Sequence, residues 1–235
     1  MSATVLLVHG AFTDGASWNK VIAHLRDEGV EARTVANPLR GLSSDGEYVS
    51  SVVAQTPGDV VLVGHSYGGP VITYAASGAE NVKALVFVGA FGIDKGESAQ
   101  SSSADFPAPP LTEALAPWTA PGSDLPDLTI QAERYREVFA ADVTDDEAAA
   151  GAVNQRPVSA LGLGEPLAVE PAWRRLPSWW VLGTEDKAAD PSYQRAAAAK
   201  VGAKLTELEG GSHSIALSRS HEVAAVILDA VHATV

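Results

Sequence analysis

The amino-acid sequence predicts an α/β protein in which a mostly parallel sheet is flanked by helices. Four short apolar runs, rich in β-branched residues, are typical of strands buried on both faces of such a sheet; they span residues 4–8, 59–64, 84–90 and 178–182. Helical patterns alternate with these runs, as in βαβ units. The alternation stops between residues 92 and 177, which therefore form an insertion.

The elements between the first two runs follow the same scheme. A helical pattern covers residues 17–28 and ends at Gly29, a residue type that commonly follows a helix. A short strand is expected over residues 31–35, and a second helix over residues 47–55. These elements connect the first two buried runs as successive strand-helix units.

The scheme returns at the carboxyl end of the chain. Residues 191–201 form an alanine-rich helical pattern after the run at 178–182, and residues 204–208 predict one more strand. A helix is expected over residues 221–231. We expect this last helix to cover one face of the sheet.

The insertion divides the predicted core into two parts, residues 1–91 and 178–235. Residues 92–177 begin with serines at 101–103 and a proline-rich stretch at 107–126, and no strand is evident in them. Long unstructured loops are rare inside compact domains. We therefore expect a helical lid that is inserted between two core strands and lies over the edge of the sheet.

Two helices are expected in this lid, over residues 128–140 and 144–153. Thr144 stands at the start of the second helix, and Glu147 follows three residues later. This is the spacing of a capping box, in which the two side chains satisfy free N–H groups at the helix start.

The composition argues against several classes of function. Of the 235 residues, 46% are hydrophobic and 19% are charged, a balance typical of a folded domain. The formal charge of −13 makes nucleic acids and anionic membranes poor partners. The chain has no cysteine, so disulfides, thiolate catalysis and cysteine-based metal sites are excluded. We expect no cofactor and no metal.

The N-terminal residues 1–8 lack the basic region and the cleavage site of a signal peptide. No apolar run approaches the roughly 20 residues that are needed to cross a bilayer. We therefore expect a cytoplasmic protein, a monomer or homodimer, that acts on a small-molecule substrate and does not bind membranes.

Ser66 is the candidate nucleophile. Gly64-x-Ser66-x-Gly68 matches the nucleophile elbow, a strained turn whose neighbours must be small so that the backbone can fold tightly. The motif is specific here because it follows a β-branched strand and precedes a helix expected over residues 70–76. Pro70 is acceptable in that helix only because it falls in the first turn.

His213 is the candidate base that would activate this serine. A serine hydroxyl is a poor nucleophile and needs a base within hydrogen-bond reach, normally histidine. His213 lies in the loop directly after the last predicted strand, at the edge where Ser66 is expected. The other histidines are explained by other roles. We assign solvated positions to His24, His221 and His232. We expect His65 to pack beneath the elbow, and His9 belongs to the loop after the first strand.

Asp186 is the leading candidate for the acid that orients this histidine. It follows the strand at residues 178–182 and precedes His213, which gives the expected chain order of serine, aspartate and histidine. Glu185 and Asp190 lie close by and are alternatively explained as a solvated loop residue and a helix N-cap. Asp94, just after the strand at residues 84–90, remains open as another source of the acid.

Two backbone N–H groups are expected to form an oxyanion hole, where each would contribute roughly 3–4 kcal/mol of transition-state stabilisation. One belongs to Tyr67, which follows the nucleophile. The other belongs to Ala11 or, as the second choice, Phe12, in the loop after the first strand, where Gly10 lets the chain bend.

Several of these segments together resemble a known family; they are residues 7–12, Trp18, residues 63–69, Gly183-x-x-Asp186 and Ser212-His213. The chain resembles a bacterial α/β-hydrolase of the small esterase type, similar to plant methylesterases and hydroxynitrile lyases. The resemblance covers essentially the whole chain and implies the α/β-hydrolase fold, the triad and the lid. Compared with larger members, the chain starts at the strand before the oxyanion loop, which implies a sheet of about six strands. Trp18 is expected to pack in the core.

Aromatic side chains are candidates for a substrate pocket between core and lid. We predict that Phe12, Tyr67, Phe91 and Trp118 bind substrate, and that other aromatic residues line the pocket or hold the lid together; these are Phe106, Tyr135 and Phe139. An apolar pocket with few charges favours an uncharged ester, lactone or thioester.

The sequence therefore predicts a serine hydrolase that cleaves a small, largely apolar ester through an acyl-enzyme intermediate. A lyase or carbon–carbon hydrolase with the same triad is an alternative, because relatives of this fold catalyse both reactions. Similar hydroxynitrile lyases carry threonine where this chain has Gly10, which favours ester hydrolysis. Ser66 argues against the dehalogenases and epoxide hydrolases of this fold, which use aspartate. A hydrolase-like ligand-binding protein is the alternative outside catalysis.

Overall fold

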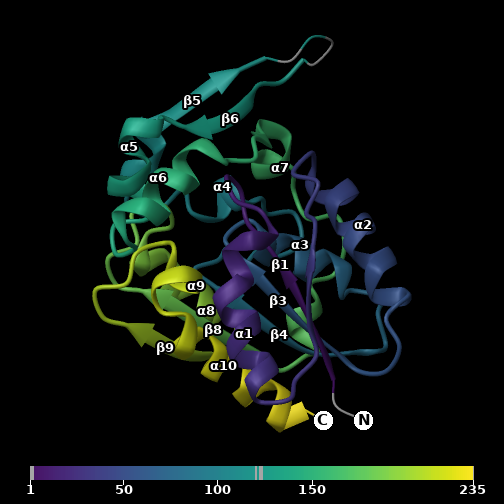
Figure 1. The fold of residues 1–235 in the computed structure, drawn as a ribbon. Helices are drawn as coiled ribbons and strands as arrows, with labels where there is room; N and C mark the ends of the chain where they lie inside the picture. The colour runs from purple at the N-terminus through teal and green to yellow at the C-terminus, as the bar shows by residue number, and fades with distance from the viewer. Residues whose placement is uncertain (1–2, 120, 122–123, 235) are drawn as a thin grey trace.

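The computed structural model describes residues 3–119, 121 and 124–234, and within them a six-stranded sheet forms the core (Figure 1). Its strands are parallel and lie in the order β2-β1-β3-β4-β8-β9. They are β1 (Thr4–Val8), β2 (Ala32–Val35), β3 (Val60–His65), β4 (Val82–Val88), β8 (Ser178–Gly183) and β9 (Lys204–Leu208). The predicted fold class and the strand number are confirmed. Residues 1–2 and 235 of the predicted core, and 120 and 122–123 of the predicted lid, lie outside the described residues.

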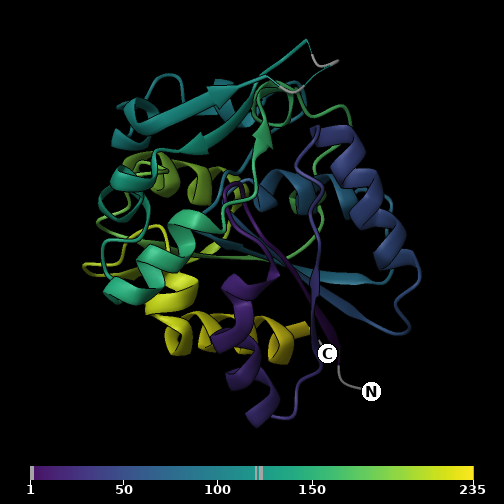
Figure 2. The same ribbon diagram turned by 45° about the horizontal axis from the view of Figure 1, so that its top comes forward.

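One face of the sheet is covered by α1 (Asn19–Asp27) and α10 (Ser220–Thr234), which lie side by side (Figures 1 and 2). Val5 and Leu7 of β1 point into this layer, where they belong to the same apolar cluster as Trp18. The predicted covering role of the last helix and the predicted core position of Trp18 are therefore confirmed.

The opposite face carries α2 (Leu42–Ala54), α3 (Gly68–Ala75) and α8 (Pro191–Val201). Leu6 and Val8 of β1 point into this second layer, because successive side chains of a strand alternate between faces. With both faces covered, every residue of β1, β3 and β8 is buried. This is the physical reason why these strands are recognisable as continuous apolar runs.

The predicted starts of α2 and α1 both differ from the structure. α2 begins five residues before the predicted residue 47, and a short 3-10 helix, η1 (Gly15–Trp18), precedes α1. α2 opens with Leu42 followed by Ser43 and Ser44, and the two serines are weak helix formers, so local propensity does not mark this boundary. Among the described residues, no helix combines the length and the apolar character that crossing a bilayer would require.

Most of the described residues between 92 and 177 form a layer above the carboxyl edge of the sheet, coloured teal to green in Figures 1 and 2, whereas the short 3-10 helix near its end, η3 (Ala172–Arg174), packs against α3. Their elements are α4 (Ala99–Ser102), η2 (Pro110–Ala114), β5 (Leu115–Trp118), β6 (Asp127–Ile130), α5 (Ala132–Phe139), α6 (Asp145–Val153), β7 (Val158–Ser159), α7 (Ala160–Gly164) and η3 (Ala172–Arg174). The capping box of α6 is present as predicted, with Thr144 and Glu147 exchanging hydrogen bonds.

The lid also contains a three-stranded antiparallel sheet in the order β5-β6-β7, so the expectation that it holds no strand is wrong. Residues 128–130, predicted to open a helix, belong to β6. These strands are at most four residues long, and β5 carries Pro117. Because a proline normally argues against a strand and pairing here is non-local, the local pattern did not reveal them.

Candidate active site

Ser66 lies at the sharp turn between β3 and α3. Its φ angle of +53° is in the left-handed region, which non-glycine residues adopt at a cost of about 1–3 kcal/mol. The turn is held by a hydrogen bond of 3.1 Å from the Ser66 N–H to the Val88 carbonyl of β4. At Gly64, a Cβ atom would lie 2.5 Å from the Gly68 carbonyl oxygen, so the elbow requires glycine there. The strained turn that the motif predicts is therefore present.

His213 and Asp186 meet in the interior, where the His213 Nδ1 atom lies 2.7 Å from a carboxylate oxygen of Asp186. Both side chains are almost completely buried. Because a carboxylate accepts hydrogen bonds, Nδ1 carries a proton, and in the tautomer that this contact selects the lone pair lies on Nε2. The pair is arranged so that Nε2 can act as a base.

Asp186 is held by four hydrogen-bond donors. One oxygen accepts from the N–H groups of Ala188 and Ala189, at 2.8 and 2.9 Å. The other accepts from His213 and from the Gln194 amide, the latter at 2.9 Å. Gln194 is fully buried on α8, and its other amide atom accepts from the Trp180 indole. Sequence reasoning missed Gln194, because an amide on a helix carries no motif.

The alternative acids lie in other surroundings. Glu185 is exposed, and Asp190 caps α8 by accepting hydrogen bonds from the N–H groups of Ser192 and Tyr193. Asp94 forms an ion pair with Arg174 at 2.5 Å. Of the candidate acids, the structure brings Asp186 to His213.

The loop after β1 lies directly against Ser66. A Cβ atom at Gly10 would lie 2.6 Å from the Ser66 Cβ, so only glycine fits without a shift. Buried His9 fixes this loop: its Nε2 accepts from the Asn37 N–H at 3.0 Å, and its Nδ1 therefore donates to the Gly10 carbonyl at 2.9 Å. Burial lowers the pKa of His9, which favours this neutral form. Phe12 has a φ of +64° and marks the bend of the loop.

His65 packs beneath the elbow, as predicted. Its Nε2 donates to the His213 carbonyl at 3.0 Å, and its ring centroid lies 4.6 Å from that of His213. Burial, together with the neighbouring His213, lowers the pKa of His65 well below its ordinary value. A neutral His65 therefore supports the loop of the candidate base without adding a second charge.

The lid also holds the loop of His213. Ser212 and Ser214, on either side of His213, donate to the Phe139 carbonyl of α5 at 3.3 and 3.0 Å. The Asp142 carboxylate accepts from the Ser212 N–H at 3.1 Å. Asp142 was not predicted as a site residue, because its partners lie 70 or more positions away.

Ser66 and His213 line the same cavity of about 70 Å³, which we call the catalytic cavity. Its other walls are apolar side chains from the core and the lid; they are Ala11, Phe12, Phe91, Leu111, Leu115, Phe139, Leu163 and Ala188. Within the described ranges, no group of three or more histidine, aspartate or glutamate side chains could hold a metal ion.

Two of the four predicted substrate-binding side chains do not reach this cavity, whereas Phe12 and Phe91 do. Trp118 is 47% exposed on β5, on the opposite face from Leu115, because side chains alternate along a strand.

The Tyr67 ring is buried away from this cavity, and its hydroxyl donates to Asp45 at 2.9 Å. Burial raises the pKa of Tyr67, so this hydroxyl remains a donor. Phe106 packs against Tyr193, at a centroid distance of 5.4 Å.

Solved structures share this architecture over nearly the whole chain. Polyneuridine aldehyde esterase superposes with a TM-score of 0.83 and 21% identity over 97% of this chain and 99% of that one. A methylesterase from Arabidopsis gives a TM-score of 0.82 and 19% identity over 98% and 99%. The predicted resemblance to plant methylesterases is thereby confirmed at the level of the fold.

Sequence comparison gives the same family. A carbendazim-hydrolysing esterase of Nocardioides sp. (strain SG-4G) is 35% identical over 109 residues, which is 41% of this chain and 45% of that protein, so the match spans less than half of the relative. The model of the alpha/beta hydrolase family matches residues 5–226. With the fold, the elbow and this match in agreement, the chain belongs to the alpha/beta hydrolase family.

Proposed function

We propose that the protein is a serine esterase in which Ser66, His213 and Asp186 form the catalytic triad. The observation that carries the proposal is that Ser66 and His213 line one apolar cavity. Asp186 contacts the Nδ1 atom of His213 and so selects the tautomer whose Nε2 can accept a proton. The names of the relatives, a methylesterase and two other esterases, support the same reaction class.

In the proposed reaction the Ser66 Oγ attacks the carbonyl carbon of the ester, and His213 Nε2 takes the hydroxyl proton. The bond from this carbon to the alcohol oxygen then breaks, and the alcohol leaves with the proton from His213. Water next attacks the acyl-Ser66 ester and gives its proton to His213. The acid is released, and the proton returns to Ser66.

The backbone N–H groups of Ala11 and Tyr67 are proposed to stabilise the oxyanion of both tetrahedral intermediates, with Phe12 as the second choice for the loop donor. The close approach of Gly10 to Ser66 supports a role for this loop. Because its conformation is held by His9 and Asn37, the donors would be preorganised.

The proposed substrate is an uncharged carboxylic ester, lactone or thioester with a short acyl part. The catalytic cavity is small and its lining is almost entirely apolar, so it favours a compact, uncharged group. A charged acyl group would lose its hydration there without finding a partner.

The position of Gly10 supports hydrolysis rather than lyase chemistry. A threonine at this position, as in the hydroxynitrile lyases that the chain resembles, would place its Cβ 2.6 Å from the Ser66 Cβ and force the loop to move. The proposal therefore retains ester hydrolysis as the reaction.

Release of p-nitrophenol from p-nitrophenyl acetate tests the proposal. We expect steady turnover by the wild-type protein and background rates for Ser66→Ala, with an unchanged melting temperature. One burst of product followed by tight retention would favour a ligand-binding protein. Equal turnover by Ser66→Ala would refute the assignment of Ser66.

A further inference from the structure

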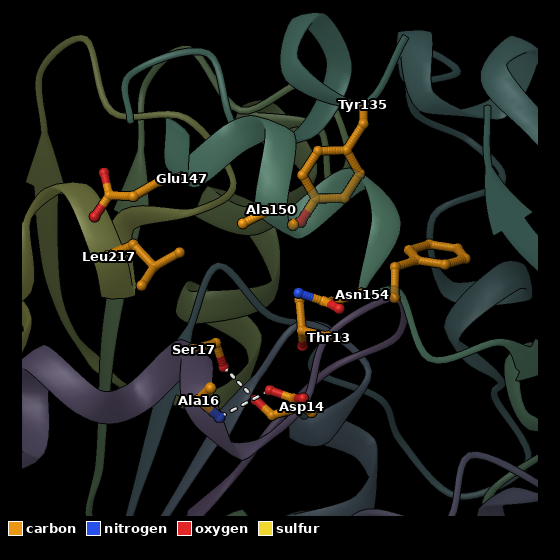
Figure 3. A pocket seen from close by; sticks show the side chains of 11 residues that line it. Thr13, Asp14, Ala16, Ser17, Tyr135, Glu147, Ala150, Asn154 and Leu217 are labelled. Atoms are coloured by element: carbon orange, nitrogen blue, oxygen red, sulfur yellow. Dashed lines mark hydrogen bonds between the residues drawn. The ribbon is translucent and has the colours of Figure 1, made fainter. Parts of the chain in front are cut away.

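A second cavity, of about 220 Å³, lies between the loop after β1 and the lid (Figure 3). In this view Asp14 and Ser17 lie below the cavity, and Tyr135 and Ala150 of the lid lie above it. Neither Ser66 nor His213 lines this cavity, whereas Phe12 lines both it and the catalytic cavity. The two spaces are therefore neighbours that share one side chain.

Aromatic rings separate the two cavities. The centroid of the Phe139 ring lies 6.2 Å from that of Phe12, 5.2 Å from that of Tyr135 and 4.8 Å from that of His213. Phe12 follows the bend next to Ser66. A substrate that reached from Ser66 into the second cavity would therefore have to pass the Phe12 ring, which lines both spaces.

The sizes of the cavities favour a substrate that uses both. The catalytic cavity, of about 70 Å³, accepts only a short acyl group, and the second cavity is about three times larger. Together they approach the roughly 300 Å³ at which sites for small molecules begin. An ester that reaches from one into the other would place its scissile bond near Phe12.

The lining of the second cavity favours an uncharged aromatic group that carries a hydrogen-bond acceptor. The Tyr135 residue is only 3% exposed, and among the described residues its hydroxyl has no hydrogen-bond partner. Burial and the neighbouring Asp14 raise the pKa of Tyr135, so the hydroxyl remains a donor. The Asp14 carboxylate disfavours an anionic ligand, and Glu147 is engaged by Lys20 at 2.6 Å.

We propose that the second cavity binds the alcohol part of the ester, an uncharged aryl group, while the catalytic cavity binds the short acyl part. Phe12 stands between the two parts and moves aside when substrate binds. This inference rests on the esterase function proposed above and adds the class of alcohol to it.

The experiment compares two esters that share the acetyl group, 2-naphthyl acetate and methyl acetate. Ala150→Leu fills the second cavity, whereas Ala149→Leu adds the same side chain to the neighbouring exposed position of α6, which does not line the cavity. We expect Ala150→Leu to raise the KM for 2-naphthyl acetate about tenfold or more, since misfit in a pocket changes discrimination by 10- to 200-fold. Methyl acetate should be hydrolysed at unchanged rates by both variants, which also shows that they fold.

Equal effects of Ala150→Leu on the two esters, or no effect on either, would overturn the inference and leave the esterase function standing. If the wild-type protein hydrolyses neither ester, the esterase function fails, and this inference fails with it. Tyr135→Phe gives a second test with 6-methoxy-2-naphthyl acetate, whose methoxy oxygen can accept from the tyrosine. We expect a higher KM for this ester but not for 2-naphthyl acetate; equal changes would contradict the role of the hydroxyl.

Discussion

Asp186 and Asp94 both follow a core strand, and their surroundings assign them different roles. Asp186 is buried, accepts four hydrogen bonds and contacts the imidazole of His213. Asp94 is partly exposed and contacts Arg174 of η3 and the backbone N–H of Lys95. The same residue type thus holds the imidazole of the proposed base in one place and pairs with an arginine of the insertion in the other.

Asp186→Asn is predicted to lower kcat about 10³–10⁴-fold, because an amide no longer holds His213 in the tautomer that accepts a proton. Asp94→Asn is the matched control and should leave kcat within a factor of a few. Steady-state kinetics with p-nitrophenyl acetate measure both. A near-neutral Asp186→Asn together with a strongly impaired Asp94→Asn would show that the acid is assigned to the wrong residue.

Residues with a local motif could be predicted, whereas residues that depend on distant partners could not. Ser66 stands in a pattern of glycines whose spacing reflects the steric limits of one turn. Gln194 and Asn37 have no such pattern, because each matters only through a group that folding brings to it. Trp118 was predicted to bind substrate but is exposed on β5, because an aromatic residue type does not indicate on which face of a strand the side chain lies.

At the scale of elements, α6 connects the lid to the core through Glu147. One Glu147 oxygen lies 2.6 Å from the Lys20 ammonium of α1, and the other accepts from Thr144 at the helix start. The capping box was predictable because it is local. The ion pair and the three lid strands were not, since both depend on pairing between distant segments.

Glu147 is predicted to make the stability of the protein depend on acid pH. Hydrogen bonds from Lys20 and Thr144 lower the pKa of Glu147 to about 2, below its ordinary value near 4.5. Its contribution is therefore full above about pH 4.5 and is lost as the pH falls towards 2. Glu147→Gln should lower the melting temperature by about 1–3 °C at pH 7, since partly exposed pairs contribute little, and by less near pH 2.5.

A double-mutant cycle with Lys20→Gln attributes this effect to the ion pair. Thermal unfolding at pH 7 and near pH 2.5 gives the coupling between the two side chains in each condition. A coupling of the same size at both pH values would contradict the assigned cause.

At the scale of the whole molecule, the proposed site depends on the convergence of loops that follow β1, β3, β8 and β9. Parallel strands place these loops at one edge of the sheet, which is why the fold class predicted from apolar runs also predicted the site. The lid completes the arrangement, because the Phe139 carbonyl and Asp142 hold the serines beside His213. The internal structure of the lid depends on packing and could not be predicted in the same way.

The most direct measurement is to treat the protein with a fluorophosphonate, which phosphonylates activated serine hydroxyls, and to locate the adduct by peptide mass spectrometry. We predict one adduct per chain, on Ser66, that forms in parallel with the loss of esterase activity and much more slowly in Asp186→Asn. Stoichiometric labelling of another residue, or hydrolysis that continues after Ser66 is fully modified, would contradict the account.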